Sequence, residues 1–299
     1  MELDSMRGQK LLLLFLLSLS LFLYLRLKPP TIILCNNFHA LPSQTSSPPP
    51  PPPLRNLSIL IGILTRADLY DRRQFLRLIY GAQSSPSDEI HVKFVFCRLT
   101  KEKQRLLVAL EILHFDDIII LNCTENMNNG KTYTFFSSLP VILPRRYDYV
   151  MKADDDVFIR LEPLASSLKP LARSDLYYGS VIPCKSYDPF VEYMSGMGFV
   201  LSWDLVEWIA TSEITANNKV GPEDKLVGKW LTLGRKARNR VTEKPGMYDY
   251  PRTNGQCSHE LIPETVAVHR LKRWDMWLHV LRFFNVTKKL KPSKLYFIE

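Results

Sequence analysis

The sequence predicts an α/β fold in which a mainly parallel central sheet is covered by helices on both faces. Short apolar segments rich in Ile, Val and Phe alternate with segments of helical periodicity, a pattern typical of right-handed strand–helix–strand crossovers. One of the apolar segments ends in three consecutive carboxylates, Asp154, Asp155 and Asp156. The 299 residues, 46% of them hydrophobic, are enough for one substantial core, and the chain shows no internal repeats.

The predicted elements follow one another along the chain in the order that such crossovers require. We expect strands at 57–64, 91–97, 117–121 and 147–153, and helices beginning near Asp71, at Lys103 and at Lys131. In the first of these helices apolar residues recur at spacings of three and four, and Gly81 ends it. The acid triplet therefore follows roughly the fourth strand.

The acid triplet points to a bound cation. Ligands of open α/β sheets gather beyond the carboxyl ends of the strands, where adjacent unpaired carboxylates would repel one another. A hard divalent ion with oxygen ligands, Mg²⁺ or Mn²⁺, removes that repulsion. The alternative is a solvated acidic turn, since most charge runs are surface features. An EF-hand is excluded because Val157, Phe158 and Ile159 stand where further ligands and a glycine are required.

Two later segments are candidates for ligand contact. The glycine-rich stretch Ser195–Gly198 lets a ligand approach the backbone closely, or else forms a simple pair of turns. Pro222 followed by Glu223 and Asp224 indicates a helix start with proline in the first position and acids in the first turn. Acids at such positions are also common capping residues.

The N-terminal part of the chain indicates a membrane anchor and a stem. We predict a cytoplasmic tail at 1–10, a transmembrane signal anchor at 11–27, a Pro-rich luminal stem at 28–56 and one catalytic domain at 57–299. A cleaved signal peptide is the competing interpretation, although no good cleavage site follows Leu25. Three glycosylation sequons, at Asn56, Asn122 and Asn285, favour a luminal head.

Cysteine spacing and charge exclude several classes of protein. The five cysteines have no CxxC spacing, which argues against a zinc knuckle or a thioredoxin-like motif. A luminal head would form one or two disulfides among the last four, whose pairing the sequence leaves open: Cys97, Cys123, Cys184 and Cys257. The net charge of +9 would attract an anionic substrate, but the basic residues are dispersed, so we expect no nucleic-acid partner.

Four ordered motifs give the chain a resemblance to a known family. They are Arg72-Arg73 through Tyr80-Gly81, Lys152 to Phe158, Tyr193 to Phe199, and Glu223 to Gly228. Over about residues 57 to 275 the chain resembles glycosyltransferase family 31, the β-1,3-galactosyltransferase and N-acetylglucosaminyltransferase group, and most closely its plant members. Each motif alone is unspecific, but the ordered set is specific.

The resemblance implies a GT-A fold and a single-pass type II Golgi membrane enzyme with its catalytic head in the lumen. The implied reaction is an inverting transfer of a hexosyl group, galactose in β-1,3 linkage by preference, from a UDP-sugar to a glycan or glycoprotein acceptor. Mn²⁺ or Mg²⁺ is the implied cofactor and UDP-galactose the preferred donor, with UDP-N-acetylglucosamine the open alternative. Homo- or hetero-oligomers with other Golgi transferases are implied partners.

The same resemblance assigns roles to individual residues. The metal ligands are Asp154, Asp156 and His269, and the catalytic base is Asp224 with Glu223 in reserve. The remaining assignments concern donor binding, by strand-end placement and family position, and they fall on Thr65, Arg66, Arg73, Lys152, Asp154 and Asp155.

Departures from the family pattern leave a second hypothesis open. Lys225 replaces the usual apolar residue after the acid pair, and Tyr80 stands where Trp is common. An ammonium beside Asp224 would lower the pKa of that carboxyl unless Lys225 points away. The alternative function is a non-catalytic carbohydrate-binding or scaffold protein that keeps the fold. A two-metal phosphohydrolase is disfavoured because none of the six histidines pairs at ligand spacing.

Overall fold

The computed structural model describes residues 56–83, 88–253, 257–288, 290–291 and 293–295. The predicted tail, anchor and nearly all of the stem lie outside these residues. Among the helices described, none is long and apolar enough to cross a membrane. The described residues all belong to one compact unit, at 53–299.

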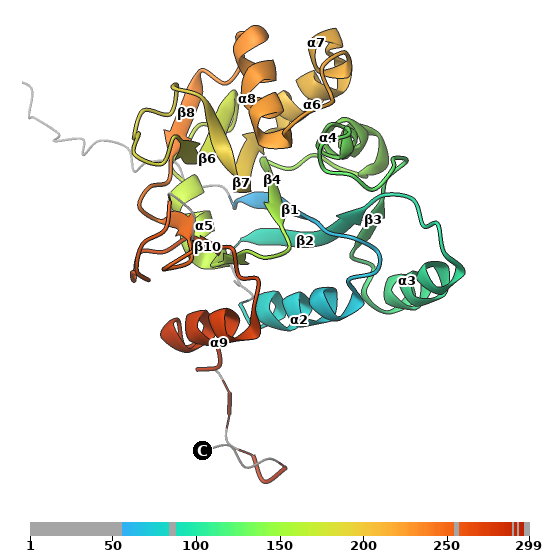
Figure 1. Ribbon diagram of the computed structural model, residues 1–299, viewed down its shortest axis with the longest axis vertical. Coiled ribbons are helices and arrows are strands. Elements are labelled where there is room, and N and C mark those ends of the chain that lie inside the picture. Colours follow the sequence, from blue (N-terminus) through green and yellow to red (C-terminus); the bar gives the residue numbers. More distant parts are fainter. Residues whose placement is uncertain (1–55, 84–87, 254–256, 289, 292, 296–299) are drawn as a thin grey trace, which may run out of the picture. The chain divides into compact units, whose positions relative to one another are not determined.

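A seven-stranded sheet forms the centre of this unit, in the order β3-β2-β1-β4-β7-β6-β8 (Figure 1). Strands β1 to β4 are parallel, and β8 is parallel to β6, so the predicted mainly parallel sheet is confirmed. Only β7 runs antiparallel to both of its neighbours. The strands are β1 (Ser58–Leu64), β2 (Glu89–Phe96), β3 (Ile118–Ile120), β4 (Tyr149–Asp154), β6 (Leu176–Ile182), β7 (Tyr193–Ser202) and β8 (Asn239–Thr242).

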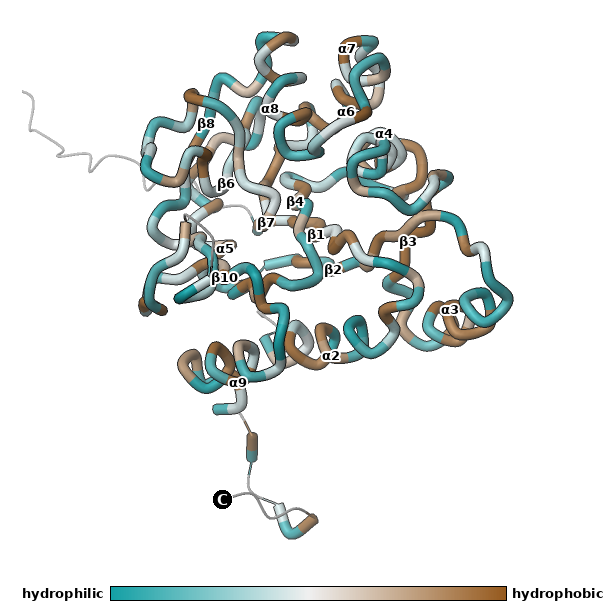
Figure 2. Tube along the Cα trace, viewed as in Figure 1, coloured by the Kyte–Doolittle hydropathy of each residue, from teal (hydrophilic) through white to brown (hydrophobic). Residues whose placement is uncertain are grey.

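Helices cover both faces of the sheet, because successive β1 side chains point to opposite sides. Ile59, Ile61 and Ile63 pack in one core with α2, α5 and α9, whereas Leu60 and Leu64 pack in a second core with α4, α6 and α8. The helices are α2 (Tyr70–Gly81), α3 (Glu102–Phe115), α4 (Lys131–Ile142), α5 (Leu161–Leu168), α6 (Trp203–Thr211), α7 (Glu213–Ala216), α8 (Glu223–Leu233) and α9 (Trp274–Phe283). Figure 2 shows hydrophobic residues along the central strands between these layers.

The structure corrects two details of the sequence prediction. The glycine-rich stretch at 195–198 is neither a pair of turns nor an open loop, because it belongs to β7, where Gly198 pairs with Ala153 of β4. Pro222 is the N-cap of α8 rather than its first residue, so the helix begins with Glu223. The predicted strands and the helices that begin near Asp71, Lys103 and Lys131 all form.

A second, small sheet carries the C-terminal part of the chain back to the end of β4. Its order is β5-β10-β9, formed by β5 (Phe158–Ile159), β9 (Met247–Asp249) and β10 (Ala267–His269). Since β5 follows the acid triplet directly, pairing with β10 brings His269 close to it. The last four cysteines form two disulfides, as expected, and the structure gives the pairing that the sequence left open: Cys97–Cys123 and Cys184–Cys257.

Candidate active site

A cavity of about 520 Å³ opens beyond the carboxyl ends of β1 and β4. Leu64 of β1 pairs with Asp154 of β4, so the segments that follow the two strands meet at this edge of the sheet. The start of α8 and the 125–131 segment form the other walls. The polar lining residues are Thr65, Arg66, Glu125, Asn126, Asn128, Lys131, Asp154, Asp155, Asp156, Glu223, Asp224 and Lys272.

The three predicted metal ligands, Asp154, Asp156 and His269, come together at this edge. Each offers one ligand atom, and these atoms all lie within 4.8 Å of one another. His269 Nε2 lies 3.4 Å from Asp156 Oδ1 and 3.9 Å from Asp154 Oδ2. Ligands around a small hard divalent ion lie about 3–4 Å apart, so small side-chain shifts suffice to hold Mg²⁺ or Mn²⁺.

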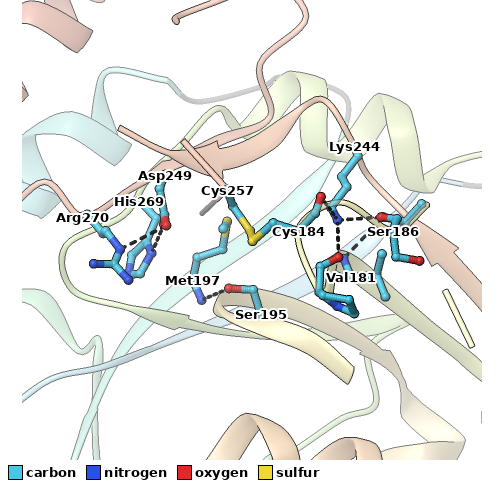
Figure 3. The surroundings of a disulfide bond; sticks show 12 residues. Val181, Cys184, Ser186, Ser195, Met197, Lys244, Asp249, Cys257, His269 and Arg270 are labelled. Atoms are coloured by element: carbon cyan, nitrogen blue, oxygen red, sulfur yellow. Dashed lines mark hydrogen bonds and ion pairs between the residues drawn. A yellow bond between two sulfur atoms is a disulfide. The ribbon is translucent and has the colours of Figure 1, made fainter. Parts of the chain in front are cut away.

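Asp249 sets the orientation of the His269 ring. The Asp249 carboxylate lies 2.7 Å from His269 Nδ1, which assigns the proton of a neutral ring to Nδ1 and leaves Nε2 free for a cation. Arg270 donates to the other Asp249 oxygen at 3.0 Å (Figure 3). A carboxylate behind a histidine is a common arrangement around protein-bound metals, so the donor set fits a cation.

Basic side chains lie against the carboxylates of Asp154 and Asp156. Lys272 Nζ lies 2.5 Å from Asp156 Oδ2. Although burial opposes the shift, the hydrogen bond from His269 and the Lys272 ammonium hold the pKa of Asp156 well below its usual range. Burial lowers the pKa of His269, but the carboxylates of Asp156 and Asp249 outweigh this effect of burial and raise the pKa to about 9. The site is therefore built for positive charge.

Asp155 faces the end of β1 rather than the histidine. The Thr65 hydroxyl donates to Asp155 Oδ2 at 2.6 Å, and burial raises the pKa of the Asp155 carboxyl. Thr65 is buried, whereas Arg66 is exposed at the cavity wall. Thr65, Arg66 and Asp155, which were predicted to contact the sugar donor, thus line the same cavity.

Lys152 connects the metal side to the first turn of α8. This fully buried side chain donates to Asp154 Oδ1 at 2.8 Å, to Glu223 Oε1 at 2.6 Å and to the Gly196 carbonyl at 2.9 Å. Although burial lowers its pKa, the carboxylates of Asp154, Glu223 and Asp224 raise it above the ordinary value. Lys152 is therefore a charged buried link and does not line the cavity.

The adjacent acids of α8 lie in different environments. Glu223 is buried, and its second oxygen accepts a hydrogen bond from the Thr132 hydroxyl at 2.8 Å. Burial raises the pKa of Glu223 to about 7, with Lys152 acting in the opposite direction. Asp224 is half-buried and packs against Gly196, where a Cβ would come within 2.6 Å of the carboxylate. Only glycine leaves room for Asp224 at this point of β7.

Lys225 makes no ion pair with the Asp224 carboxylate. Its exposed ammonium lies 5.8 Å from the centroid of the Tyr193 ring and forms no ion pair within the described part of the chain. Neighbouring residues on a helix diverge by about 100°. The departure at this position thus leaves the carboxylate unpaired.

Arg73 is not brought into the cavity. Its side chain is fully buried and bound to Glu111 of α3, with a hydrogen bond of 2.9 Å from Nε to Oε2. The same guanidinium donates to the backbone carbonyls of Arg66 and Ala67 at 2.6 and 3.0 Å. Arg73 thus supports the loop that carries Arg66. In this position it does not reach the cavity predicted to hold the UDP-sugar donor.

The sequence did not reveal several residues of the site. Asp249 and Lys272 follow no ligand spacing and reach the site only through the small sheet. Lys131 donates to the Thr65 carbonyl at 2.5 Å and pairs with Glu125. The buried position of Lys131 could have been suspected from its place at the start of an apolar helix.

Comparisons with known proteins agree with the motifs. A family model described as Galactosyltransferase matches residues 71–187. The β-1,3-galactosyltransferase pvg3 of Schizosaccharomyces pombe is 23% identical, over 77% of this chain and 75% of its own length. Mouse β-1,3-galactosyltransferase 6 is 26% identical over 65% of this chain, and the probable β-1,3-galactosyltransferase 12 of Arabidopsis thaliana is 25% identical over 69%. The chain spans 64% of the length of each of these two relatives.

Proposed function

We propose that this chain is an inverting, metal-dependent hexosyltransferase. The proposal follows from its membership of glycosyltransferase family 31, the galactosyltransferase family. The proposed donor is a UDP-sugar, by preference UDP-galactose, and the product a β-1,3 linkage to a glycan or glycoprotein. One observation carries the proposal: the cluster of Asp154, Asp156 and His269 and the unpaired carboxylate of Asp224 line or border the same cavity. The names of the relatives support the linkage and the sugar.

The metal side would stabilise the leaving group. Asp154, Asp156 and His269 would hold Mn²⁺ or Mg²⁺, which when bound neutralises negative charge on the departing diphosphate. Thr65 and Arg66 lie where a nucleotide diphosphate would enter, and Arg66 adds a positive charge at the wall. Arg73 acts indirectly, because it holds the backbone carbonyl of Arg66. We infer a GT-A type of fold for this arrangement.

The α8 side would activate the acceptor. Asp224 is the base, since it is half-buried and makes no hydrogen bond or ion pair within the described residues. Its carboxylate accepts the proton of the acceptor hydroxyl as that oxygen attacks the sugar from the face opposite the diphosphate. Glu223 positions the helix start, because Lys152 and Thr132 occupy its oxygens.

We further propose that the head acts in the Golgi lumen, anchored by the apolar run at 11–27. Two disulfides support an oxidising compartment, since such bonds are rare in reducing ones. The apolar run and the sequons support the same location. Assembly with other Golgi transferases is part of the proposal and rests on family resemblance.

A donor screen tests the proposal. The purified full chain is incubated with a panel of UDP-sugars and saccharide acceptors, with Mn²⁺ or with EDTA, and both UDP release and product are measured. Turnover of one UDP-sugar that requires the metal supports the proposal and identifies the donor. Saccharide binding without turnover of any UDP-sugar would contradict it and favour the non-catalytic carbohydrate-binding alternative.

A further inference from the structure

The segment between β6 and β7 exposes large apolar side chains beside the active site. In this 183–193 segment, 64% of Tyr187, 57% of Phe190 and 48% of Val191 are accessible to solvent. Exposed aromatic side chains gathered in one short segment are more informative than a single exposed leucine, because such patches commonly mark binding surfaces. No part of the mechanism above uses them.

The 183–193 segment is fixed at several points. Cys184 is joined to Cys257 by a disulfide. Lys244 Nζ donates to the carbonyls of Cys184 and Ser186 at 2.9 and 2.7 Å, as Figure 3 shows beside that disulfide. Asp188 accepts a hydrogen bond from the Phe190 amide at 2.9 Å. A surface held in this way loses little conformational entropy when a ligand binds.

Cations lie against the aromatic rings of the segment. Lys244 Nζ is 5.8 Å from the centroid of the Tyr187 ring, and Arg240 Cζ is 5.5 Å from that of Phe190. A cation positioned over a ring occupies one face and helps to fix its orientation. Because both rings are more than half exposed, the remaining surface is open to a ligand.

Helix α8 connects this surface to the proposed base. Asp224 packs against Gly196, and Gly228, one turn further along α8, packs against Tyr193, where a Cβ would approach the Tyr193 Cβ to 2.5 Å. Positions four apart share one face of a helix and are separated by about 6 Å along its axis. The chain from Gly196 back to Tyr193 therefore runs along α8 away from Asp224 and leads into the segment with Phe190 and Tyr187.

We propose that the 183–193 segment is the acceptor-binding surface and that sugar rings of the acceptor stack on the exposed faces of Tyr187 and Phe190. This inference rests on the proposed function. A pyranose ring presents a face of C–H groups that packs against aromatic rings, while its hydroxyls remain free for hydrogen bonds. Because the segment continues into the strand that packs along α8 from Asp224, an acceptor chain that extends from the base along α8 would reach these rings. A saccharide is the occupant that this position favours over a second copy of the chain.

Ring-deleting variants test the surface. In the full chain, Tyr187→Ala and Phe190→Ala are compared with Phe283→Ala, a control that removes an exposed phenylalanine from α9, which packs on the opposite face of the sheet. Binding of di- and trisaccharides ending in galactose, N-acetylglucosamine or N-acetylgalactosamine is followed by saturation-transfer NMR, and UDP affinity by calorimetry. We expect each variant of the segment to lose about tenfold in saccharide affinity, with UDP affinity unchanged. Phe190→Trp should bind saccharide, unlike Phe190→Ala, since it keeps an aromatic ring at this position.

The outcomes separate this inference from the proposed function. If the wild-type chain binds no saccharide, or if both alanine variants bind as wild type does, the inference is overturned. A change of sedimentation from dimer to monomer in the variants, without loss of saccharide binding, would also overturn it and assign the surface to a second copy. Loss of saccharide binding in a chain that turns over no UDP-sugar would support the surface while rejecting the transferase.

Discussion

The two sides of the cavity solve the problem of clustered acids in different ways. On the metal side, His269 faces both Asp154 and Asp156, and Lys272 pairs with Asp156, so basic groups beside the proposed cation site balance these charges. On the α8 side, Lys152 and Thr132 occupy the oxygens of Glu223 permanently and leave Asp224 unpaired. The carboxylates around this cavity thus differ in role because their burial and their partners differ.

This contrast explains why adjacent acids are not interchangeable. Glu223 is buried and held by two donors, so its main effect is on the position of α8. Asp224, one residue later, points at Gly196 and the cavity. A base needs a carboxylate that is free to accept a proton, and only Asp224 meets this condition at the start of α8.

The largest effect is expected from removing Asp156, the metal-side acid that pairs with both His269 and Lys272. Asp156→Ala should lower transfer by at least about a thousandfold and abolish Mn²⁺ binding, because the central ligand of the cluster is lost. Mn²⁺ titration by calorimetry and product formation measure the two effects. Glu213→Ala, which removes an exposed acid from α7, is the matched control. Undiminished Mn²⁺ affinity in Asp156→Ala would show that the metal site lies elsewhere.

The α8 acids offer the next largest effect. Asp224→Asn should lower kcat by about 10²- to 10⁴-fold while UDP-sugar binding persists, as expected for loss of a general base. Glu223→Gln should retain more of kcat and instead lower the urea midpoint of unfolding, because a buried acceptor of two hydrogen bonds is weakened. Measured kcat and unfolding curves compare the two variants. If Glu223→Gln were the more damaging to kcat, the assigned roles would be reversed.

The charge of His269 makes the unfolding free energy depend on pH, and this dependence tests its pairing with the metal-side acids. In the metal-free chain its pKa is raised from 6.5 to about 9, so its stabilising effect is complete below about pH 6.5 and disappears as pH rises through 9. A shift of this size corresponds to about 3 kcal/mol of unfolding free energy. Urea unfolding in EDTA at pH 6 and pH 9.5 should show the loss in the wild type. His269→Asn should lack it, and equal losses in both proteins would contradict the pairing.

The smallest effect is expected at Lys225. Because its ammonium lies over Tyr193 and makes no ion pair in the described residues, Lys225→Leu should change kcat by less than about twofold and leave the pH profile in place. Initial rates from pH 5 to 9 measure this. A profile displaced to higher pH in the variant would mean that the ammonium does act on the base.

Much of the fold was predictable because its determinants are local. Apolar runs and helical periodicity located β1 to β4 and the helices between them, and the acid triplet located the end of β4. The helix start with its acid pair was also predicted from local residues, whereas the role of Asp224 as base came from the family resemblance. These features depend on residues within a few positions of one another, which is the range over which periodicity and capping operate.

Long-range packing decided the rest. His269 joins Asp156 only because β10 pairs with β5, and Asp249 orients the ring because β9 pairs with β10. No local pattern distinguishes Arg66, which lines the cavity, from Arg73, which is buried against Glu111, since an arginine stem packs in a core as readily as along a surface. The sequence by itself determined the alternating elements and the acids that they carry. The tertiary structure alone decided which acids are paired, since charge balance depends on partners far away in the chain.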